Sequence, residues 1–342
     1  MPNSKIAIYA LTSQGVNLAR RLASKLGGTI YASRRLEAEN VTPFDSLRDL
    51  VAATFNAFDS HIFVAAAGIT VRCIAPHLQS KETDPAVICL DQGGLFAVSL
   101  LSGHLGGANE LAADAARAVG GQAVITTATD SAGVLSVDML AKSKGLGIGN
   151  IERVKDVNMA LLEGQPVQLY DPEDWLGLAW HSNFDSVAGA DDWDSSRPGI
   201  WVSWHSDCPE GALSLHPRVL HLGIGCRRDV SVYEILDHVG DVFGKRGFAM
   251  ESIASVGSVE AKRNEAGLLE AAFEFGVSPV FYSTAQLTAI DVPTPSDKVQ
   301  AHMGVPSVAE ASALLAAHGG KLIVTKEKTD TVTLAIARSR RA

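Results

Sequence analysis

The stretch KIAIYALTSQGVNLARRLASKLGGTIYAS, residues 5–33, decides the fold class. It opens with the compact apolar run KIAIYAL, which predicts a buried strand. Apolar residues then recur at helical spacing from Val16 to Leu26, and Gly27 and Gly28 close the helix. A second apolar run, GTIYAS, follows directly. Strand, helix and strand in this order predict a largely parallel sheet covered by helices.

The same alternation continues to about residue 150 and resumes at residue 219. The further strands expected in the first region are 61–66, 86–91, 96–101 and 122–127, and the helices are 46–57, 106–119 and 133–144. The strands expected in the second region are 219–225, 250–256, 277–282, 321–325 and 332–337, and the helices are 232–245, 263–275 and 307–318. The predicted fold class is α/β, with two α/β domains that each contain a mainly parallel sheet.

The segment between these regions has a different composition. Residues 151–218 hold all five tryptophans of the chain and show weak helical periodicity. We interpret the tryptophans as core anchors of a small module, with a stacking platform as the alternative. The predicted organisation is a first domain at 1–150, a smaller acidic middle segment at 151–218, and a second domain at 219–338.

The charge is concentrated in this middle segment. The chain has 38 acidic and 29 basic side chains, a net charge of -9, and residues 151–218 hold 12 of the acidic and 4 of the basic ones. A net negative protein repels polyanions, so nucleic acid and anionic membranes are not expected as partners. The flanking domains are nearly neutral, which leaves their arginine and lysine side chains able to bind an anionic small molecule.

Cysteine spacing and apolar runs give further expectations. The four cysteines, at positions 73, 89, 208 and 226, have no metal-ligand spacing, so no protein metal site is predicted. The longest apolar run, Ile62–Val71, is far shorter than the ~20 residues that a bilayer requires. The N-terminus MPNSKIAIYALTSQG has no secretory pattern. We therefore expect a cytoplasmic protein.

Glycines and polar side chains gather at expected strand ends and helix starts between residues 65 and 115. Those singled out as candidate site residues are Gly68, Arg72, Lys81, Asp91, Ser102, Gly103, His104, Gly106, Gly107, Asn109 and Glu110. The carboxyl edge of an open α/β sheet is where ligands bind. A hydroxyl, an imidazole and free helix amides at Ser102–Asn109 could bind a carboxylate, or polarise an ester carbonyl while His104 activates water. The alternative is an N-capped helix whose glycines serve close packing.

A second candidate loop follows the strand that ends near Gly225. Arg228 stands where a dinucleotide fingerprint needs its third glycine, which disfavours nicotinamide binding. Backbone amides beside Arg227 and Arg228 predict an anion cradle, with a tight turn and solvated arginines as the alternative. Lys262 and Arg263 lie in a similar loop.

Longer motifs resemble a known family. The run GITVRCIAPHLQSKETDPAVICLDQGG, followed by LLSGHLGGANELA, resembles the CbiG family, the cobalt-precorrin-5A hydrolases of anaerobic cobalamin biosynthesis. The pieces GIGCRRDVS, IASVGSVEAKRNEAGLLEAA and PSVAEASALLAA resemble the C-terminal domain of that family, which also occurs alone as the CobE protein. The likeness covers about residues 5–150 and 219–337.

The resemblance implies a reaction and roles. The family opens the δ-lactone of cobalt-precorrin-5A and releases acetaldehyde, giving cobalt-precorrin-5B. For this reaction the resemblance implies His104 as the first choice of base. Glu110 or Asp91 could also take the proton of the opened hydroxyl group, and Ser102 is a further catalytic candidate. Amides near Gly103, Gly106 and Gly107 would stabilise the oxyanion. The cations assigned to the carboxylates of the corrinoid are Arg72, Lys81, Arg227, Arg228, Lys262 and Arg263. The cobalt arrives inside the substrate, so no cofactor is expected.

Two other functions are kept open. A non-catalytic carrier of corrinoid intermediates would bind the same ligand without releasing acetaldehyde. An α/β enzyme for a phosphorylated or nucleotide ligand would use the same glycine-rich loops. Neighbouring enzymes of the cobalamin pathway and a second copy of the chain also stay open as partners.

Overall fold

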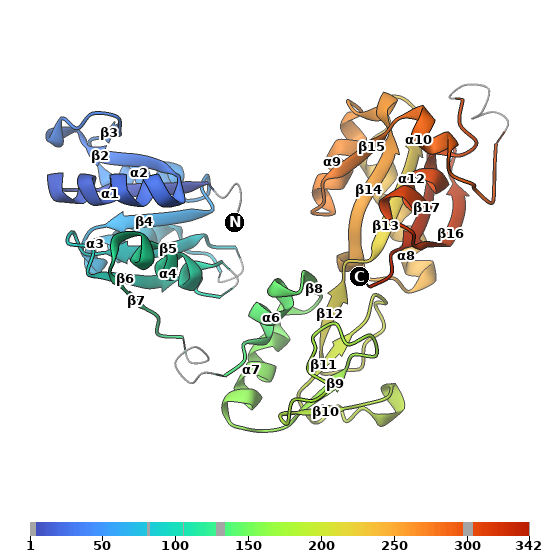
Figure 1. Ribbon diagram of the computed structural model, residues 1–342, viewed down its shortest axis with the longest axis horizontal. Coiled ribbons are helices and arrows are strands. Elements are labelled where there is room, and N and C mark those ends of the chain that lie inside the picture. Colours follow the sequence, from blue (N-terminus) through green and yellow to red (C-terminus); the bar gives the residue numbers. More distant parts are fainter. Residues whose placement is uncertain (1–4, 81–82, 105, 128–133, 297–303, 342) are drawn as a thin grey trace. The chain divides into compact units, whose positions relative to one another are not determined.

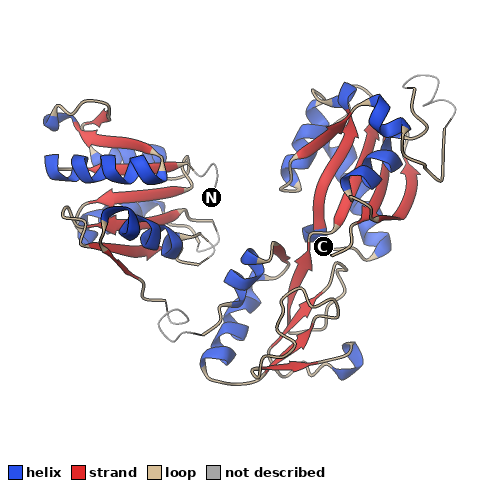
Figure 2. Ribbon diagram, viewed as in Figure 1, coloured by secondary structure: helices blue, strands red, loops and turns tan. Residues whose placement is uncertain are grey.

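The part of the chain that the structure describes forms three sheets with helices beside them. The computed structural model describes residues 5–80, 83–104, 106–127, 134–296 and 304–341. One sheet has seven strands and the other two have five each, and Figure 2 shows how strands and helices are distributed. Within the described part of the chain, no helix is both long and apolar enough to cross a bilayer. Most neighbouring strands run parallel, which confirms the predicted fold class.

The first compact unit, Met1–Met139, contains the seven-stranded sheet in the order β3-β2-β1-β4-β5-β6-β7 (Figure 1). Its strands are β1 (Ile6–Ala10), β2 (Thr29–Ser33), β3 (Thr42–Phe44), β4 (Ser60–Val64), β5 (Ala86–Leu90), β6 (Phe96–Leu101) and β7 (Gln122–Val124). Its neighbouring strands pair in parallel with one exception, the antiparallel pair β5 and β6. This exception determines where the candidate residues lie.

Helices cover both faces of this sheet. They are α1 (Ser13–Leu26), α2 (Leu47–Thr54), α3 (Ala67–Ile74) and α4 (Ala108–Val119). On one face, residues of α1 and α4 share a core with Ile8 and Ile62. On the other face, residues of α2 and α3 share a core with Tyr9 and Phe63. Because successive residues of a strand point to opposite faces, both cores draw on β1, and every residue of β1 is buried.

The second of these cores contains a buried polar network. The His61 ring lies 3.1 Å from the carbonyl oxygen of Phe55 through Nε2 and 2.9 Å from the Tyr9 hydroxyl through Nδ1. A carbonyl can only accept, so Nε2 carries the hydrogen and Nδ1 accepts from Tyr9. Burial lowers the pKa of His61 to about 4, so the ring is neutral at pH 7.

The second unit, Leu140–Ala342, begins with a sheet in the order β10-β9-β11-β12-β8. The strands are β8 (Leu146–Ile148), β9 (Val167–Tyr170), β10 (Phe184–Ser186), β11 (Gly199–Val202) and β12 (Ala212–Pro217), and the helix is α7 (Val154–Leu162). The helix α6 (Val137–Ser143) begins in the first unit and ends in the second. Trp201 stacks on Tyr170 with ring centroids 3.8 Å apart and meets Trp193 edge-on. These tryptophans are core anchors, whereas Trp180 is 99% exposed.

The division between the units differs from the predicted boundary at residue 150. β8 lies in the predicted first domain, yet it pairs antiparallel with β12 in the second unit. A strand of three residues is too short for its hydrophobic pattern to reveal its pairing partner. The sequence therefore gives no sign that this segment belongs with the later strands.

The C-terminal sheet has the order β15-β14-β13-β17-β16. Its strands are β13 (Leu220–Cys226), β14 (Ile253–Val259), β15 (Pro279–Tyr282), β16 (Lys321–Lys328) and β17 (Val332–Arg338), and its helices are α8 (Val232–Arg246), α9 (Ala266–Glu274), α10 (Thr284–Thr288) and α12 (Val308–Ala316). Two short 3-10 turns among the described residues flank β14, Met250–Ser252 and Glu260–Lys262. Earlier ones are Arg34–Leu36, Ala75–His77, Ile151–Arg153 and Ala190–Asp192. β17 lies between β13 and β16 and is antiparallel to both.

The two glycines of β13 have different surroundings. A methyl group added at Gly223 would lie 1.8 Å from the carbonyl oxygen of Ala309 in α12, so helix and strand are in direct backbone contact there. A methyl group added at Gly225 would meet its nearest neighbours at 3.8 Å, an ordinary contact distance. Gly223 is therefore required for packing, and Gly225 is not.

Replacing Gly223 by alanine is expected to destabilise the second unit strongly. The new methyl group would push α12 away from β13, and overpacking of this kind costs about 1–3 kcal/mol or more. The measurement is the urea midpoint of unfolding. Gly225→Ala is the matched control and should change the free energy of unfolding by less than about 1 kcal/mol. Equal effects of the two substitutions would contradict the packing assignment.

Acidification is expected to destabilise both units. Burial lowers the pKa of His61 to about 4, and burial followed by the charge of His318 lowers the pKa of His221 to about 4. Between pH 6.5 and 4 the unfolded chain binds more protons than the folded one, so stability falls by up to about 1.4 kcal/mol per pH unit for each histidine.

The measurement is urea unfolding at a series of pH values, followed by probes in each unit. His61→Gln should flatten the pH dependence of the first unit only, and His221→Gln that of the second unit only. A wild-type stability that stays constant from pH 6.5 to pH 4 would show that these rings do not titrate as described.

Candidate active site

The direction of β6 places the candidate residues at two edges of the first sheet. β4 and β5 run parallel, so the residues that follow them, including Gly68 and Asp91, lie at the carboxyl edge. β6 runs the opposite way, because Leu101 pairs with Val87 and Ala97 pairs with Leu90. The loop that follows β6 therefore lies at the amino edge of β4 and β5.

The expectation that all these residues share one edge is wrong. β5 has five residues, and at about 3.3 Å per residue its two ends are about 15 Å apart. Asp91 and the start of α3 are thus separated from His104 by the length of a strand. A group that must exchange a proton with His104 directly has to lie at the amino edge.

The residues at the carboxyl edge are engaged locally. The Asp91 carboxylate accepts hydrogen bonds from the backbone amides of Gly93, at 2.9 Å, and Phe96, at 2.7 Å, and so closes the turn between β5 and β6. The Arg72 guanidinium donates to the carbonyl oxygen of Gly68 at 3.0 Å. Arg72 is otherwise exposed, so it can still meet an anion in solvent.

At the amino edge, close packing shapes the loop after β6. The Ser102 hydroxyl donates to the carbonyl oxygen of Asp84 at 2.8 Å, and Ser102 has a positive φ of 56°. A methyl group at Gly106 would lie 2.3 Å from Cβ of Ser102, and one at Gly103 would lie 2.8 Å from Oδ1 of Asn109. Both glycines are therefore required by the shape of the loop that carries His104.

Backbone amides at the start of α4 are already used by this loop. The amide of Gly107 donates to His104 O at 2.9 Å, that of Ala108 to Ser102 O at 3.1 Å, and that of Asn109 to Gly103 O at 3.0 Å. An anion would have to displace these bonds to reach the same amides. Gly107 is thus a structural residue here, with a φ of 87° at the N-cap of α4.

The Asn109 side chain holds three segments together. Its Oδ1 accepts from the Ser99 hydroxyl of β6 at 2.7 Å, and its Nδ2 donates to the Thr127 hydroxyl at 3.1 Å. Asn109 is buried. It therefore fixes the His104 loop against β6 and against the chain that leaves β7, a positioning role in place of the substrate contact predicted from the sequence.

His104 lies beside a carboxylate that sequence reasoning missed. Its Nδ1 is 3.7 Å from Oδ2 of Asp138, with the His104 side chain 20% exposed and the Asp138 side chain 5% exposed. The Ser136 hydroxyl donates to the other oxygen of Asp138 at 2.6 Å. Because β7 pairs in parallel with β6, the chain after β7 leaves at the same edge as His104. That pairing indicates the edge to which the chain after β7 leads, but not which of its residues meets His104.

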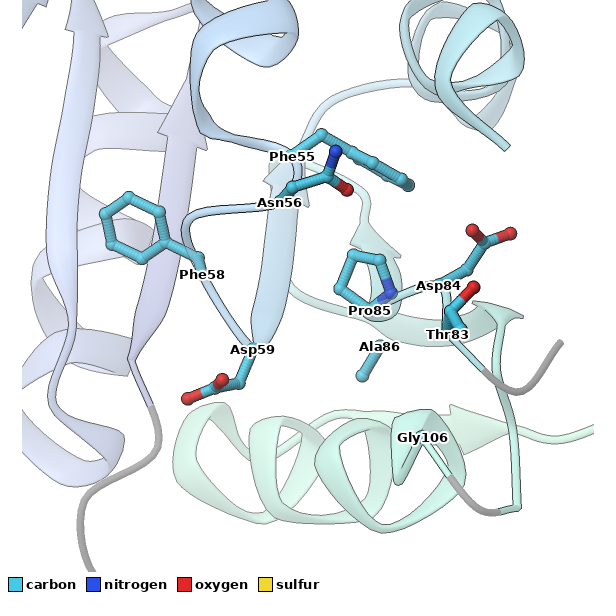
Figure 3. Close-up of a pocket in the computed structure, with 9 residues that line it drawn as sticks. All are labelled: Phe55, Asn56, Phe58, Asp59, Thr83, Asp84, Pro85, Ala86 and Gly106. Carbon is cyan, nitrogen blue, oxygen red and sulfur yellow. The ribbon is translucent and has the colours of Figure 1, made fainter. Parts of the chain in front are cut away.

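A cavity of about 340 Å³ opens at this amino edge (Figure 3). Its lining residues are Phe55, Asn56, Phe58, Asp59, Thr83, Asp84, Pro85, Ala86 and Gly106. Figure 3 shows Gly106 just before the helix α4, with Asp59 and Asp84 on different sides of the cavity. The Asp59 carboxylate accepts from the Lys5 amide at 2.8 Å, and the Asp84 carboxylate accepts from the Gln79 amide at 3.0 Å. The cavity is therefore polar and lined by carboxylates.

Glu110 is exposed in the first turn of α4. It lines a neighbouring cavity of about 220 Å³ together with Lys25, Ser60 and Gly107. Glu110 thus remains at the same edge as His104, unlike Asp91. Lys81 lies outside the described residues.

In the C-terminal sheet the predicted cations differ in availability. Arg227 and Arg228 are exposed after β13. Lys262 forms a largely buried ion pair of 2.8 Å with Glu265, and hydrogen bonding to Lys262 lowers the pKa of the Glu265 carboxylate. Arg263 is exposed beside Glu260 and lies 5.5 Å over the Phe281 ring. The two arginines after β13 are therefore better placed than Lys262 to bind a carboxylate.

Within the described ranges, no group of three or more His, Cys, Asp or Glu side chains is placed to hold a metal ion. Cys226, at the end of β13, directly precedes the candidate residue Arg227. Burial raises its pKa to about 11, so it is protonated at neutral pH and is a poor metal ligand or nucleophile.

Comparison with protein families gives three consecutive matches. The family described as Cobalamin synthesis G N-terminal matches residues 49–130, Cobalamin biosynthesis central region matches 135–217, and Cobalamin synthesis G C-terminus matches 220–337.

Curated relatives match over nearly the whole chain. The cobalt-precorrin-5A hydrolase of Priestia megaterium is 31% identical, over 97% of this chain and 94% of the relative. The cobalt-precorrin-5A hydrolase of Salmonella typhimurium is 33% identical, over 97% of each chain. Protein CobE of Sinorhizobium sp is 34% identical, over 34% of this chain and 79% of that protein.

Truncating Asn109 is expected to loosen the loop that carries His104. Asn109→Ala leaves the half-buried hydroxyls of Ser99 and Thr127 without this partner, which costs about 1–3 kcal/mol. The measurement is the free energy of unfolding of the first unit. Asn17→Ala, at an exposed position of α1, is the control and should change it by less than about 0.5 kcal/mol. A loss no larger than that of the control would contradict the clamp.

Proposed function

The chain belongs to the cobalamin synthesis G (CbiG) family, and on that premise we propose that it opens the δ-lactone of cobalt-precorrin-5A and releases acetaldehyde. It is a hydrolase with a role in cobalamin biosynthesis. The finer statement, that a carbon–carbon bond is broken and acetaldehyde leaves, is part of the proposal. The product is cobalt-precorrin-5B.

The observation that carries the proposal is the placement of His104. It is a partly exposed imidazole in a glycine-constrained loop, beside a buried carboxylate and at the edge that contains the cavity. Histidine is the side chain whose ordinary pKa lies nearest to neutral pH, which suits a general base. Loop geometry of this kind supports a reaction centre, because a carrier has no need of a base.

In the proposed first step, His104 takes a proton from water as the water oxygen attacks the lactone carbonyl. The acyl carbon–oxygen bond then breaks, and His104 returns its proton to the leaving alkoxide, which becomes a hydroxyl group. The new carboxylic acid loses its proton to solvent, so His104 is again neutral for the second step. The oxyanion formed on the way needs hydrogen-bond donors. The amides of Gly107, Ala108 and Asn109 are bonded within the loop, so we assign this role to the Gly103 and Gly106 positions.

In the proposed second step, the new hydroxyl loses its proton and becomes a carbonyl group. The adjacent carbon–carbon bond breaks, its electron pair passes to the macrocycle, and acetaldehyde leaves. His104 is our first choice to take this proton, and Glu110 at the same edge is the second. Asp91 is no longer a candidate for direct transfer, because it lies at the far end of β5.

Substrate carboxylates need exposed cations and donors. Among the described residues assigned to this role, Arg72, Arg227, Arg228 and Arg263 are exposed, whereas Lys262 is paired with Glu265. The cavity of about 340 Å³ is lined by two carboxylates, so it suits the lactone edge better than a propionate side chain. Cobalt is carried by the substrate, and we propose no separate cofactor.

The test is acetaldehyde release from cobalt-precorrin-5A under anaerobic conditions, coupled to an aldehyde-reducing enzyme. His104→Ala should lower kcat by a factor of about 10²–10⁴, the usual contribution of a general base. His181→Ala, an exposed histidine of the second unit, is the control and should keep the wild-type rate.

Two results would contradict parts of the proposal. Wild-type turnover by His104→Ala would remove His104 as the base. Binding of the corrinoid by the wild-type protein without any release of acetaldehyde would instead support a carrier.

A further inference from the structure

Three side chains from two separate segments meet at the amino edge of the first sheet. Ser136 and Asp138 come from the chain after β7, and His104 comes from the loop after β6. Ser136 Oγ donates to Asp138 Oδ1 at 2.6 Å, and Asp138 Oδ2 lies 3.7 Å from His104 Nδ1. All three belong to the first unit, which ends at the residue after Asp138.

From this arrangement we propose that Asp138 is the positioning residue that sets the tautomer and orientation of the His104 ring. The inference rests on the proposed function only in taking His104 as the base. A carboxylate accepts hydrogen bonds and does not donate them. Beside it, Nδ1 therefore carries the ring hydrogen, and Nε2 keeps the lone pair that takes a proton from water.

Burial fixes the Asp138 carboxylate in place and strengthens its attraction to a charged His104 ring. The Asp138 side chain is 5% exposed, and the neighbouring Val137 is fully buried, so the position of the carboxylate is fixed by packing. A buried charge needs compensating partners, and Ser136 supplies one of them. When His104 takes a proton, the ring becomes a cation next to this carboxylate, and attraction in a poorly hydrated site stabilises it.

The 3.7 Å separation fits this role. It is within ion-pair range and longer than an ordinary N–H···O hydrogen bond of about 2.9 Å. Catalytic hydrogen bonds are commonly long in the unliganded state and shorten when substrate binds or charge develops. The Asn109 clamp ties the His104 loop to Thr127, so this loop is held at the edge before substrate arrives.

The first test is a long-range proton–nitrogen NMR spectrum of the histidine rings, recorded above pH 7 on the full chain. The protein has 10 histidines, and the His104 signal is assigned by its loss in His104→Gln. The expected result is the Nδ1–H tautomer for His104 in the wild-type protein. In Asp138→Asn the ring should change to the Nε2–H tautomer, which free imidazole side chains prefer.

Asp49→Asn is the matched control, because Asp49 also lies in the first turn of a helix of this unit. It should leave the His104 signal unchanged. An Nε2–H tautomer in the wild-type protein, or an unchanged tautomer in Asp138→Asn, would overturn the inference. The wild-type spectrum decides the question even where Asp138→Asn folds poorly.

Kinetics give the second test. Asp138→Asn should lower kcat about 10²- to 10³-fold with KM changed less than about threefold, since substrate binding does not use Asp138. Ser136→Ala should lower kcat about tenfold or less, because the carboxylate keeps its charge. A loss that falls mainly on KM would show that Asp138 acts through binding and would overturn the inference.

The two proposals fail in distinguishable ways. If His104→Ala is fully active, the base assignment fails while the NMR result still reports on the pair. If His104→Ala is inactive and Asp138→Asn has wild-type kcat, the positioning role fails alone.

Discussion

The antiparallel pairing of β5 with β6 is the constraint on which the candidate site depends. One antiparallel pairing in an otherwise parallel sheet carries the chain to the amino edge. The parallel partner β7 then delivers its following segment to the same edge. His104 and Asp138 are far apart in the sequence, and they meet because β6 and β7 run in the same direction and lead to the same edge. Without the reversal, His104 would lie about 15 Å away, beside Asp91.

Much of the fold could be predicted from the sequence, including the hairpin of β5 and β6, which the strand assignment alone did not identify. The alternation of strand-like apolar runs with helical apolar spacing predicted the α/β class and most of the strands. The strands expected at 86–91 and 96–101 are separated by four residues, whereas a parallel crossover needs about a dozen. The hairpin was therefore implied by loop length. Asp138 was not accessible in this way, because its position depends on the register of the three-residue strand β7.

Gly223, Gly225 and Lys262 show which distinctions between residues of one motif cannot be made from the sequence alone. Gly223 and Gly225 stand in one motif, yet the backbone of α12 touches the first, whereas a methyl group at the second would meet only the Val308 and Thr333 side chains at 3.8 Å. Lys262 looks like a free cation until Glu265 is seen at 2.8 Å. For Gly223 the deciding neighbour comes from another element, whereas for Lys262 it lies three residues along the same loop. The sequence motif identifies the loop, and only the packing shows which of its residues remain available to a ligand.

The direct backbone contact at Gly223 also limits how the C-terminal sheet can move. Side chains usually form a layer between helix and strand that can slide by small rotamer changes, and no such layer exists there. α12 and β13 are consequently expected to shift as one rigid body. Any rearrangement that a ligand causes at Arg227 and Arg228, which follow β13, has to bend the chain at this loop or carry α12 with it.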